Sequence, residues 1–153
     1  MHALEAKIPP LAAALSAAVL MWFIAWAVPA FGIRIPWRGP ISALLVAAGA
    51  VISASGILSF RRVGTTVNPM NPNASSSLVA FGVYKMSRNP MYLGFFFMLA
   101  GWAVFLSNAL SLLLPPAFVI YINRFQIEPE ERALAAKFGR EFAMYKSRVR
   151  RWI

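Results

Sequence analysis

Long apolar runs separated by short polar connections dominate the chain up to residue 122. Residues 11–33 and 41–60 form the first two runs, and at about 1.5 Å per residue each is long enough as a helix to cross a hydrocarbon core of about 30 Å. Two shorter runs, 91–106 and 110–122, are joined by a short turn and are therefore expected to form an antiparallel hairpin. The pattern predicts about four transmembrane helices.

Small residues and prolines give these runs a finer pattern. Gly49, Ser53 and Gly56 recur at spacings of four and three in the second run, which favours close packing against a neighbouring helix. Pro115 and Pro116 are expected to bend or break the fourth helix, because proline lacks an amide donor and clashes with the preceding turn.

The residues after 122 have the opposite character. They hold eight of the fifteen basic residues and four of the five acidic residues. Pro129 suits the first turn of a helix, and apolar side chains then recur at helical spacing. We therefore expect a C-terminal amphipathic cytoplasmic helix, whose apolar face carries Ile127, Leu134, Phe138, Phe142 and Tyr145. Glu131 lies on the same face and needs a cationic or hydrogen-bonding partner there.

Composition supports an all-α integral membrane protein, with residues 1–153 as a single domain. Apolar residues make up 59% of the chain, and the mean hydropathy is +0.63. The chain has no cysteine and a single histidine, His2, so no metal site is predicted. Its net charge of +10 comes mostly from bases that flank the apolar runs, which indicates contact with lipid headgroups rather than nucleic acid.

Two polar segments contain the candidate chemistry, and the first is the start of the third apolar run. Pro90 fits the first turn of a helix and leaves Arg88 and Asn89 just outside it, beside the unpaired amides of that turn. With Tyr92 and Gly94 one turn on, these groups suit a carboxylate, a phosphate or a ribose. The alternative interpretation is a helix start anchored at the headgroups by an arginine and a tyrosine.

The second segment is the polar stretch 63–83, which precedes that helix start. It lacks both periodicity and charge and contains many Asn, Ser and Thr side chains. A loop of this length is either a linker or a functional loop that hydrogen-bonds a polar ligand.

Together these motifs resemble the isoprenylcysteine carboxyl methyltransferase and phospholipid N-methyltransferase group of integral-membrane enzymes. The resemblance covers about residues 60–152, and many relatives have histidine at the position of Asn89. It is carried by Ser87-Arg88-Asn89-Pro90-Met91-Tyr92-Leu93-Gly94, by Glu130-Glu131, and by Leu134, Phe138-Gly139, Tyr145 and Val149-Arg150-Arg151-Trp152.

The resemblance implies that S-adenosyl-L-methionine is the methyl donor and that residues 60–152 bind it. Glu131 would hold the ribose hydroxyls or the amino group, and Arg88 would meet the donor carboxylate or the acceptor. The implied catalytic residues are Arg88, Asn89 and Tyr92, and the implied cofactor-binding residues are Val79, Gly82, Tyr84, Asn89, Pro90, Tyr92, Gly94, Glu130 and Glu131.

The expected acceptor is a lipophilic molecule in the membrane, with a carboxylate as the group that is methylated. Because glutamate has an unperturbed pKa of about 4.3, Glu130 and Glu131 are expected to be weak bases. An acceptor that is already a carboxylate needs no base. The alternatives are N-methylation of a phospholipid amine, an NADPH-dependent membrane reductase and a noncatalytic membrane subunit. A proton-coupled exporter is disfavoured, because the four apolar runs contain no acidic residue.

The distribution of bases predicts a multi-pass protein with both termini, residues 61–91 and the active site on the cytoplasmic side. Thirteen of the fifteen bases then lie inside, and Arg34 and Arg38 lie outside. Reporter fusions at residue 75 and at the C-terminus should both report a cytoplasmic location. An external location for either would contradict the topology.

Overall fold

A computed structural model of the protein describes residues 7–62 and 77–153, and these residues form helices and no strand. His2 and most of the polar stretch 63–83 lie outside the described residues. The main helices are α1 (Pro10–Ala27), α2 (Arg38–Arg62), α3 (Pro90–Leu106), α4 (Leu114–Ile122) and α5 (Glu128–Arg148). The prediction of an all-α protein is confirmed.

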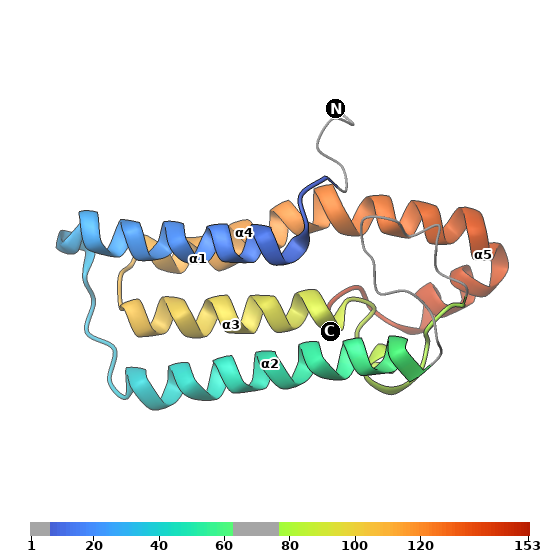
Figure 1. The fold of residues 1–153 in the computed structure, drawn as a ribbon, viewed down its shortest axis with the longest axis horizontal. Helices are drawn as coiled ribbons and strands as arrows, with labels where there is room; N and C mark the ends of the chain where they lie inside the picture. Colours follow the sequence, from blue (N-terminus) through green and yellow to red (C-terminus); the bar gives the residue numbers. More distant parts are fainter. Residues whose placement is uncertain (1–6, 63–76) are drawn as a thin grey trace.

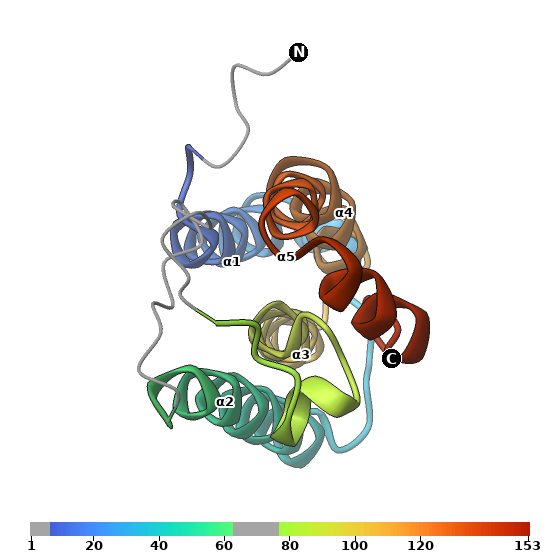
Figure 2. The same ribbon diagram turned by 90° about the vertical axis from the view of Figure 1, so that its right-hand side faces the viewer.

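Four of these helices run side by side, and α5 extends beyond one end of the bundle (Figure 1). The end-on view shows α3 between α2 on one side and the pair α1 and α4 on the other (Figure 2). Its central position makes α3 the helix that connects the rest of the bundle. The end of α3 that begins at Pro90 faces α5, which places the predicted helix start beside the charged C-terminal region.

The first and fourth apolar runs differ from their predicted bounds for a common reason. Helix α1 ends at Ala27 rather than at residue 33, and a 3-10 turn (η1, Pro29–Phe31) follows. Pro29 disfavours helical backbone at the residue before it, and that residue has φ −127° and ψ 65°. In the fourth run, Pro115 lies in the first turn of α4 after a 3-10 turn (η4, Ser111–Leu113). The prolines therefore begin this helix, and the expected break within it is absent.

The C-terminal region forms the predicted helix, but this helix follows directly on α4 and bends within its length. Helix α4 continues without a loop through a π-helical segment (η5, Asn123–Ile127) into α5. Within α5, Gly139 has φ 46° and ψ −116°, so the chain bends sharply there. Only glycine adopts such a conformation readily. Phe142 and Tyr145 therefore lie beyond a bend and do not continue the face that carries Ile127.

The small residues of α2 pack against α3, as predicted. Gly49 lies against the backbone of Gly94, and a Cβ atom at either glycine would overlap the facing helix. Ser53 donates a side-chain hydrogen bond to the carbonyl oxygen of Met91 (3.1 Å). Gly56 leaves room for the Met91 side chain one turn further on.

The outer surface of the bundle is apolar, as expected for a protein surrounded by lipid. Large side chains such as Val19, Trp26 and Leu44 are 65%, 69% and 72% exposed. The buried positions of α2, in contrast, are all serine or glycine. Helices α1 and α2 are long and apolar enough to cross a membrane, and α3 is a shorter apolar helix. The total of four spans stays a prediction.

The close contact between α2 and α3 leads to a test with a matched control. Gly49→Ala should destabilise the protein by about 1–3 kcal/mol, because the new methyl group would overlap the backbone of Gly94. Gly39→Ala in the same helix should be neutral or slightly stabilising, because nothing lies within 4 Å of its Cβ position. Thermal unfolding in detergent measures both, and equal effects would contradict this packing.

Candidate functional site

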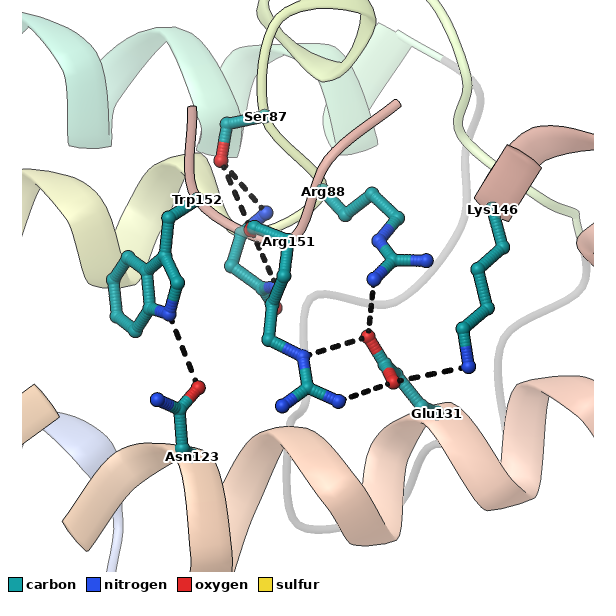
Figure 3. A network of polar contacts seen from close by, with 8 residues as sticks. Ser87, Arg88, Asn123, Glu131, Lys146, Arg151 and Trp152 are labelled. Carbon is teal, nitrogen blue, oxygen red and sulfur yellow. Dashed lines mark hydrogen bonds and ion pairs between the residues drawn. The ribbon is translucent and has the colours of Figure 1, made fainter. Parts of the chain in front are cut away.

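Three segments far apart in the sequence meet at the start of α3. They are residues 87–89, the first turn of α5, and the last five residues, 149–153, which we call the C-terminal strap. Figure 3 shows the polar side chains that these segments bring together. The strap crosses in front of the helix start and lies beside α5.

Glu131 is the centre of this arrangement. Its Oε1 atom lies 3.0 Å from Nη2 of Arg88 and accepts a hydrogen bond from Nε of Arg151 (3.3 Å). Its Oε2 atom accepts a hydrogen bond from Nη2 of Arg151 (2.8 Å) and lies 3.7 Å from Nζ of Lys146. Three cations therefore surround one carboxylate, and the site carries an excess of positive charge. The prediction that Glu131 needs a cationic partner is confirmed.

Arg88 and Glu131 form the buried part of this cluster. Their side chains are 9% and 12% exposed, whereas Arg151 is 32% exposed and Lys146 is 54% exposed. Nε and Nη1 of Arg88 are buried and have no hydrogen-bond partner among residues 7–62 and 77–153. An unsatisfied buried donor is costly, and its occurrence on a charged group calls for an explanation. Their N–H groups are suited to donate hydrogen bonds to an anionic or carbonyl oxygen of a ligand.

The strap is attached to the helix start through its backbone. The carbonyl oxygen of Arg150 accepts a hydrogen bond from the backbone amide of Arg88 (3.1 Å). The carbonyl oxygen of Arg151 accepts one from the side-chain amide of Asn89 (3.0 Å) and one from the hydroxyl of Ser87 (3.4 Å). Asn89, which was predicted to be catalytic, therefore uses its amide to hold the strap.

A second carboxylate, that of the neighbouring residue Glu130, accepts a hydrogen bond from the hydroxyl of Tyr92. The pKa of Glu130 is raised to about 7 as the net result of three effects: burial raises it most, the hydrogen bond from Tyr92 lowers it, and the negative charge of Glu131 raises it. The expectation that both glutamates are weak bases is therefore wrong for Glu130. Near neutral pH its carboxylate can accept and return a proton.

Three of the predicted cofactor-binding residues, Val79, Gly82 and Tyr84, lie in the packed region between α2 and the start of α3. Val79 and Tyr84 are buried, and the Tyr84 ring packs edge-on against Phe60. Tyr145 donates a hydrogen bond to the carbonyl oxygen of Tyr84 (2.8 Å), which ties the second half of α5 to this region. Gly82 has φ +60°, a conformation that favours glycine, and lies beside the hydroxyl of Ser59.

The bend at Gly139 leaves an open groove of about 580 Å³ between the two halves of α5. Of the predicted cofactor-binding residues in the described part of the chain, Glu131 alone lines it. Gly94 lies instead in the contact between α2 and α3. The groove is lined by Glu128, Glu131, Arg132, Ala135, Gly139, Phe142, Ala143, Lys146 and Arg151.

Sequence reasoning missed four residues of the site, namely Ser87, Tyr145, Lys146 and Arg151. They belong to the motifs that carried the family resemblance or adjoin them, but the basic ones were interpreted as contacts to lipid headgroups. Arg151 reaches Glu131 across twenty residues of sequence and across the bend at Gly139. Helical periodicity cannot reveal such a contact, because it assumes a continuous helix.

Comparison with protein families and individual proteins gives a consistent result. The family model for phospholipid methyltransferase matches residues 37–141, which is more than half of the chain. The chain is 32% identical to a protein-S-isoprenylcysteine O-methyltransferase of Xenopus laevis over 76% of its length and 40% of the relative. It is 29% identical to protein-S-isoprenylcysteine O-methyltransferase B of Arabidopsis thaliana over 74% of its length and 57% of the relative.

A shorter relative matches a smaller share of the chain. An uncharacterized protein of Haemophilus influenzae is 44% identical over its full length, which corresponds to 41% of this chain. The chain thus matches about half the length, or less, of the two named methyltransferases above. No solved structure matches the chain significantly.

The environment of Glu130 predicts a pH-dependent contribution to stability. A carboxyl group whose pKa rises from 4.5 when unfolded to about 7 when folded stabilises the folded state most below pH 4.5. This contribution is lost as the pH rises through 7. The melting temperature of Glu130→Gln relative to the wild type should therefore increase from pH 5 to pH 8.

Glu128→Gln is the matched control, because it removes a carboxylate that pairs with Arg124 on the exposed side of the same helix (2.8 Å). Its melting temperature relative to the wild type should stay constant over this range. A constant difference for Glu130→Gln as well would contradict the assigned environment of Glu130.

Proposed function

The chain belongs to the phospholipid methyltransferase family, and we propose that it transfers a methyl group from S-adenosylmethionine to a carboxylate on a lipophilic acceptor in the membrane. The observation that carries this proposal is the buried pair of Arg88 and Glu131, in which two donors of Arg88 have no partner in the described part of the chain. The family match favours this function over a membrane reductase or a noncatalytic subunit.

The charges of the site fit the proposed donor. S-adenosylmethionine has an ammonium group, a carboxylate and a ribose, so its site must offer both signs of charge and hydrogen-bond acceptors. Glu131 would hold the amino group or the ribose hydroxyls, because it is a carboxylate at the edge of an open groove. Arg88 would hold a carboxylate through Nε and Nη1, which are buried and form no hydrogen bond with any described residue.

The protein would contribute to the reaction mainly by orienting the reactants and by excluding water. S-adenosylmethionine supplies a methyl group on a positively charged sulfur atom. Arg88 is held rigidly by its ion pair with Glu131 and by its backbone contact to the strap, so it can orient a carboxylate without further ordering. The low exposure of both side chains keeps water away from the charged groups.

The acceptor is proposed to approach from the bilayer. The site lies at the end of α3, and the neighbouring helices expose large apolar side chains along their length. Two of the relatives are named protein-S-isoprenylcysteine O-methyltransferases, which supports a lipidated carboxylate as the acceptor. A cytoplasmic site, as proposed from the distribution of bases, would give the donor access from the aqueous side.

N-methylation of a phospholipid amine is the second candidate, and one observation favours it. An amine must lose a proton before it can attack a methyl group, and Glu130 has a pKa of about 7. Its carboxylate is therefore suited to accept that proton near neutral pH. The proton would reside on a carboxylate oxygen of Glu130, beside the hydroxyl of Tyr92.

The purified protein in lipid nanodiscs, supplied with radiolabelled S-adenosylmethionine, tests the two candidates. Transfer to a prenylated cysteine carboxylate should proceed with kcat/KM nearly constant from pH 6 to pH 9, because a carboxylate acceptor is already ionised. Activity on phosphatidylethanolamine alone, with a rate that rises with pH, would instead assign an N-methyltransferase. Absence of transfer to either acceptor class would contradict the proposed function.

Donor binding provides an independent test at Glu131. Glu131→Gln should weaken the affinity for S-adenosylmethionine roughly ten- to a hundredfold, because a buried charged hydrogen bond contributes about 1.5–3 kcal/mol. Glu128→Gln should have a much smaller effect, because Glu128 also lines the groove but its side chain is 38% exposed and already pairs with Arg124. Calorimetric titration of both folded variants measures the difference in affinity. Equal small effects would contradict a role of Glu131 in donor binding and would indicate a structural role.

A further inference from the structure

We propose that Arg151 is a positioning residue, which acts through Glu131 and aligns this carboxylate for the methyl donor. This inference rests on the proposed function, because it takes Glu131 as a ligand of the donor. Arg151 lies in the C-terminal strap, twenty residues beyond Glu131. Its contribution would make the end of the chain part of the donor-binding site.

The contact between the two side chains has the geometry that orients a carboxylate. Nε of Arg151 donates to Oε1 of Glu131 (3.3 Å), and Nη2 donates to Oε2 (2.8 Å). A planar guanidinium that reaches both oxygens fixes the rotation of the carboxylate as well as its position. Arg88 contacts one oxygen only, with Nη2 at 3.0 Å from Oε1. Arg88 therefore neutralises Glu131, whereas Arg151 determines which way its lone pairs point.

The backbone of the strap holds Arg151 in place for this contact. The carbonyl oxygen of Arg151 accepts hydrogen bonds from the side chains of Asn89 and Ser87 at the start of α3. The next residue, Trp152, donates from Nε1 to Oδ1 of Asn123 in η5 (3.1 Å). The strap is thus pinned on both sides of the Arg151 side chain, which points down to Glu131 (Figure 3).

The same contacts explain why loss of Arg151 should affect binding more than folding. Glu131 would keep its buried partner Arg88, so no isolated buried charge would result. Arg151 itself is 32% exposed, and its backbone contacts do not depend on its side chain. A neutral side chain at this position would therefore leave the strap attached and free the Glu131 carboxylate to rotate.

Calorimetric titration of the full-length protein with S-adenosylmethionine tests this role. Arg151→Gln should raise Kd on the order of tenfold, because charged hydrogen bonds to the carboxylate that binds the donor are lost. Arg151→Lys should give an intermediate Kd, because lysine keeps the charge but cannot reach both oxygens from one plane. Arg148→Gln removes the same charge from an exposed residue at the end of α5 and should leave Kd unchanged.

A double-mutant cycle separates positioning from direct contact with the donor. In the Glu131→Gln background, Arg151→Gln should cause no further loss of affinity, because its effect passes through that carboxylate. Additive losses would overturn the proposal and would indicate that Arg151 contacts the donor itself. Tighter binding by Arg151→Gln alone would also overturn it, since Arg151 would then compete with the donor for Glu131.

Thermal unfolding in the absence of S-adenosylmethionine shows whether a substitution affects folding rather than donor binding. The melting temperatures of Arg151→Gln and Arg148→Gln should fall within a few degrees of the wild type, and Arg151→Lys carries the test if Arg151→Gln fails to fold. Wild-type protein that binds no S-adenosylmethionine would overturn the proposed function together with this inference. Wild-type binding that is weakened by Glu131→Gln but not by either Arg151 substitution would overturn the role of Arg151 alone.

Discussion

The buried ion pair between Arg88 and Glu131 is the interaction on which the rest of the site depends. Removing two charges from water is costly, and their attraction offsets that cost only if the geometry is well defined. The protein meets this condition by bringing the start of α3, the first turn of α5 and the C-terminal strap to one point. Nearly all contacts of the strap described above serve to hold this pair or to cover it.

The membrane imposes the second constraint, and it explains the unusual distribution of polar residues. Lipid provides no partner for a polar group, so hydroxyls in the bundle must bond within the protein. Ser111 donates to the carbonyl oxygen of Met21 (2.9 Å), and Trp102 donates from Nε1 to that of Ala18 (3.0 Å). Since apolar burial gives little drive to helix association in lipid, close packing at glycine and serine connects α2 to α3. This packing fixes the helix whose first turn adjoins Arg88.

The sequence was sufficient for features that depend on neighbouring residues. The start of α3 at Pro90, the packing stripe of α2 and the need of Glu131 for a partner follow from local stereochemistry, helical spacing and burial of charge. The sequence was insufficient for features that depend on contacts between residues far apart in the chain. Glycine also occurs within continuous helices, so Gly139 alone did not predict the bend. The C-terminal strap returns to α3 only after that bend. The pKa of Glu130 depends on burial by residues distant in sequence.

The two adjacent glutamates show how one helical turn can support two different tasks. Successive residues on a helix point about 100° apart, so Glu130 faces Tyr92 while Glu131 faces the three cations. Burial of Glu130 raises its pKa to about 7, which suits exchange of a proton, whereas Glu131 is suited to hold a charged or hydroxyl ligand. A carboxylate acceptor would require Glu131 and Arg88 alone, and an amine acceptor would require Glu130 as well. In the proposed reaction, the identity of the acceptor would thus determine whether the second carboxylate takes part in the chemistry or only in the packing around Tyr92.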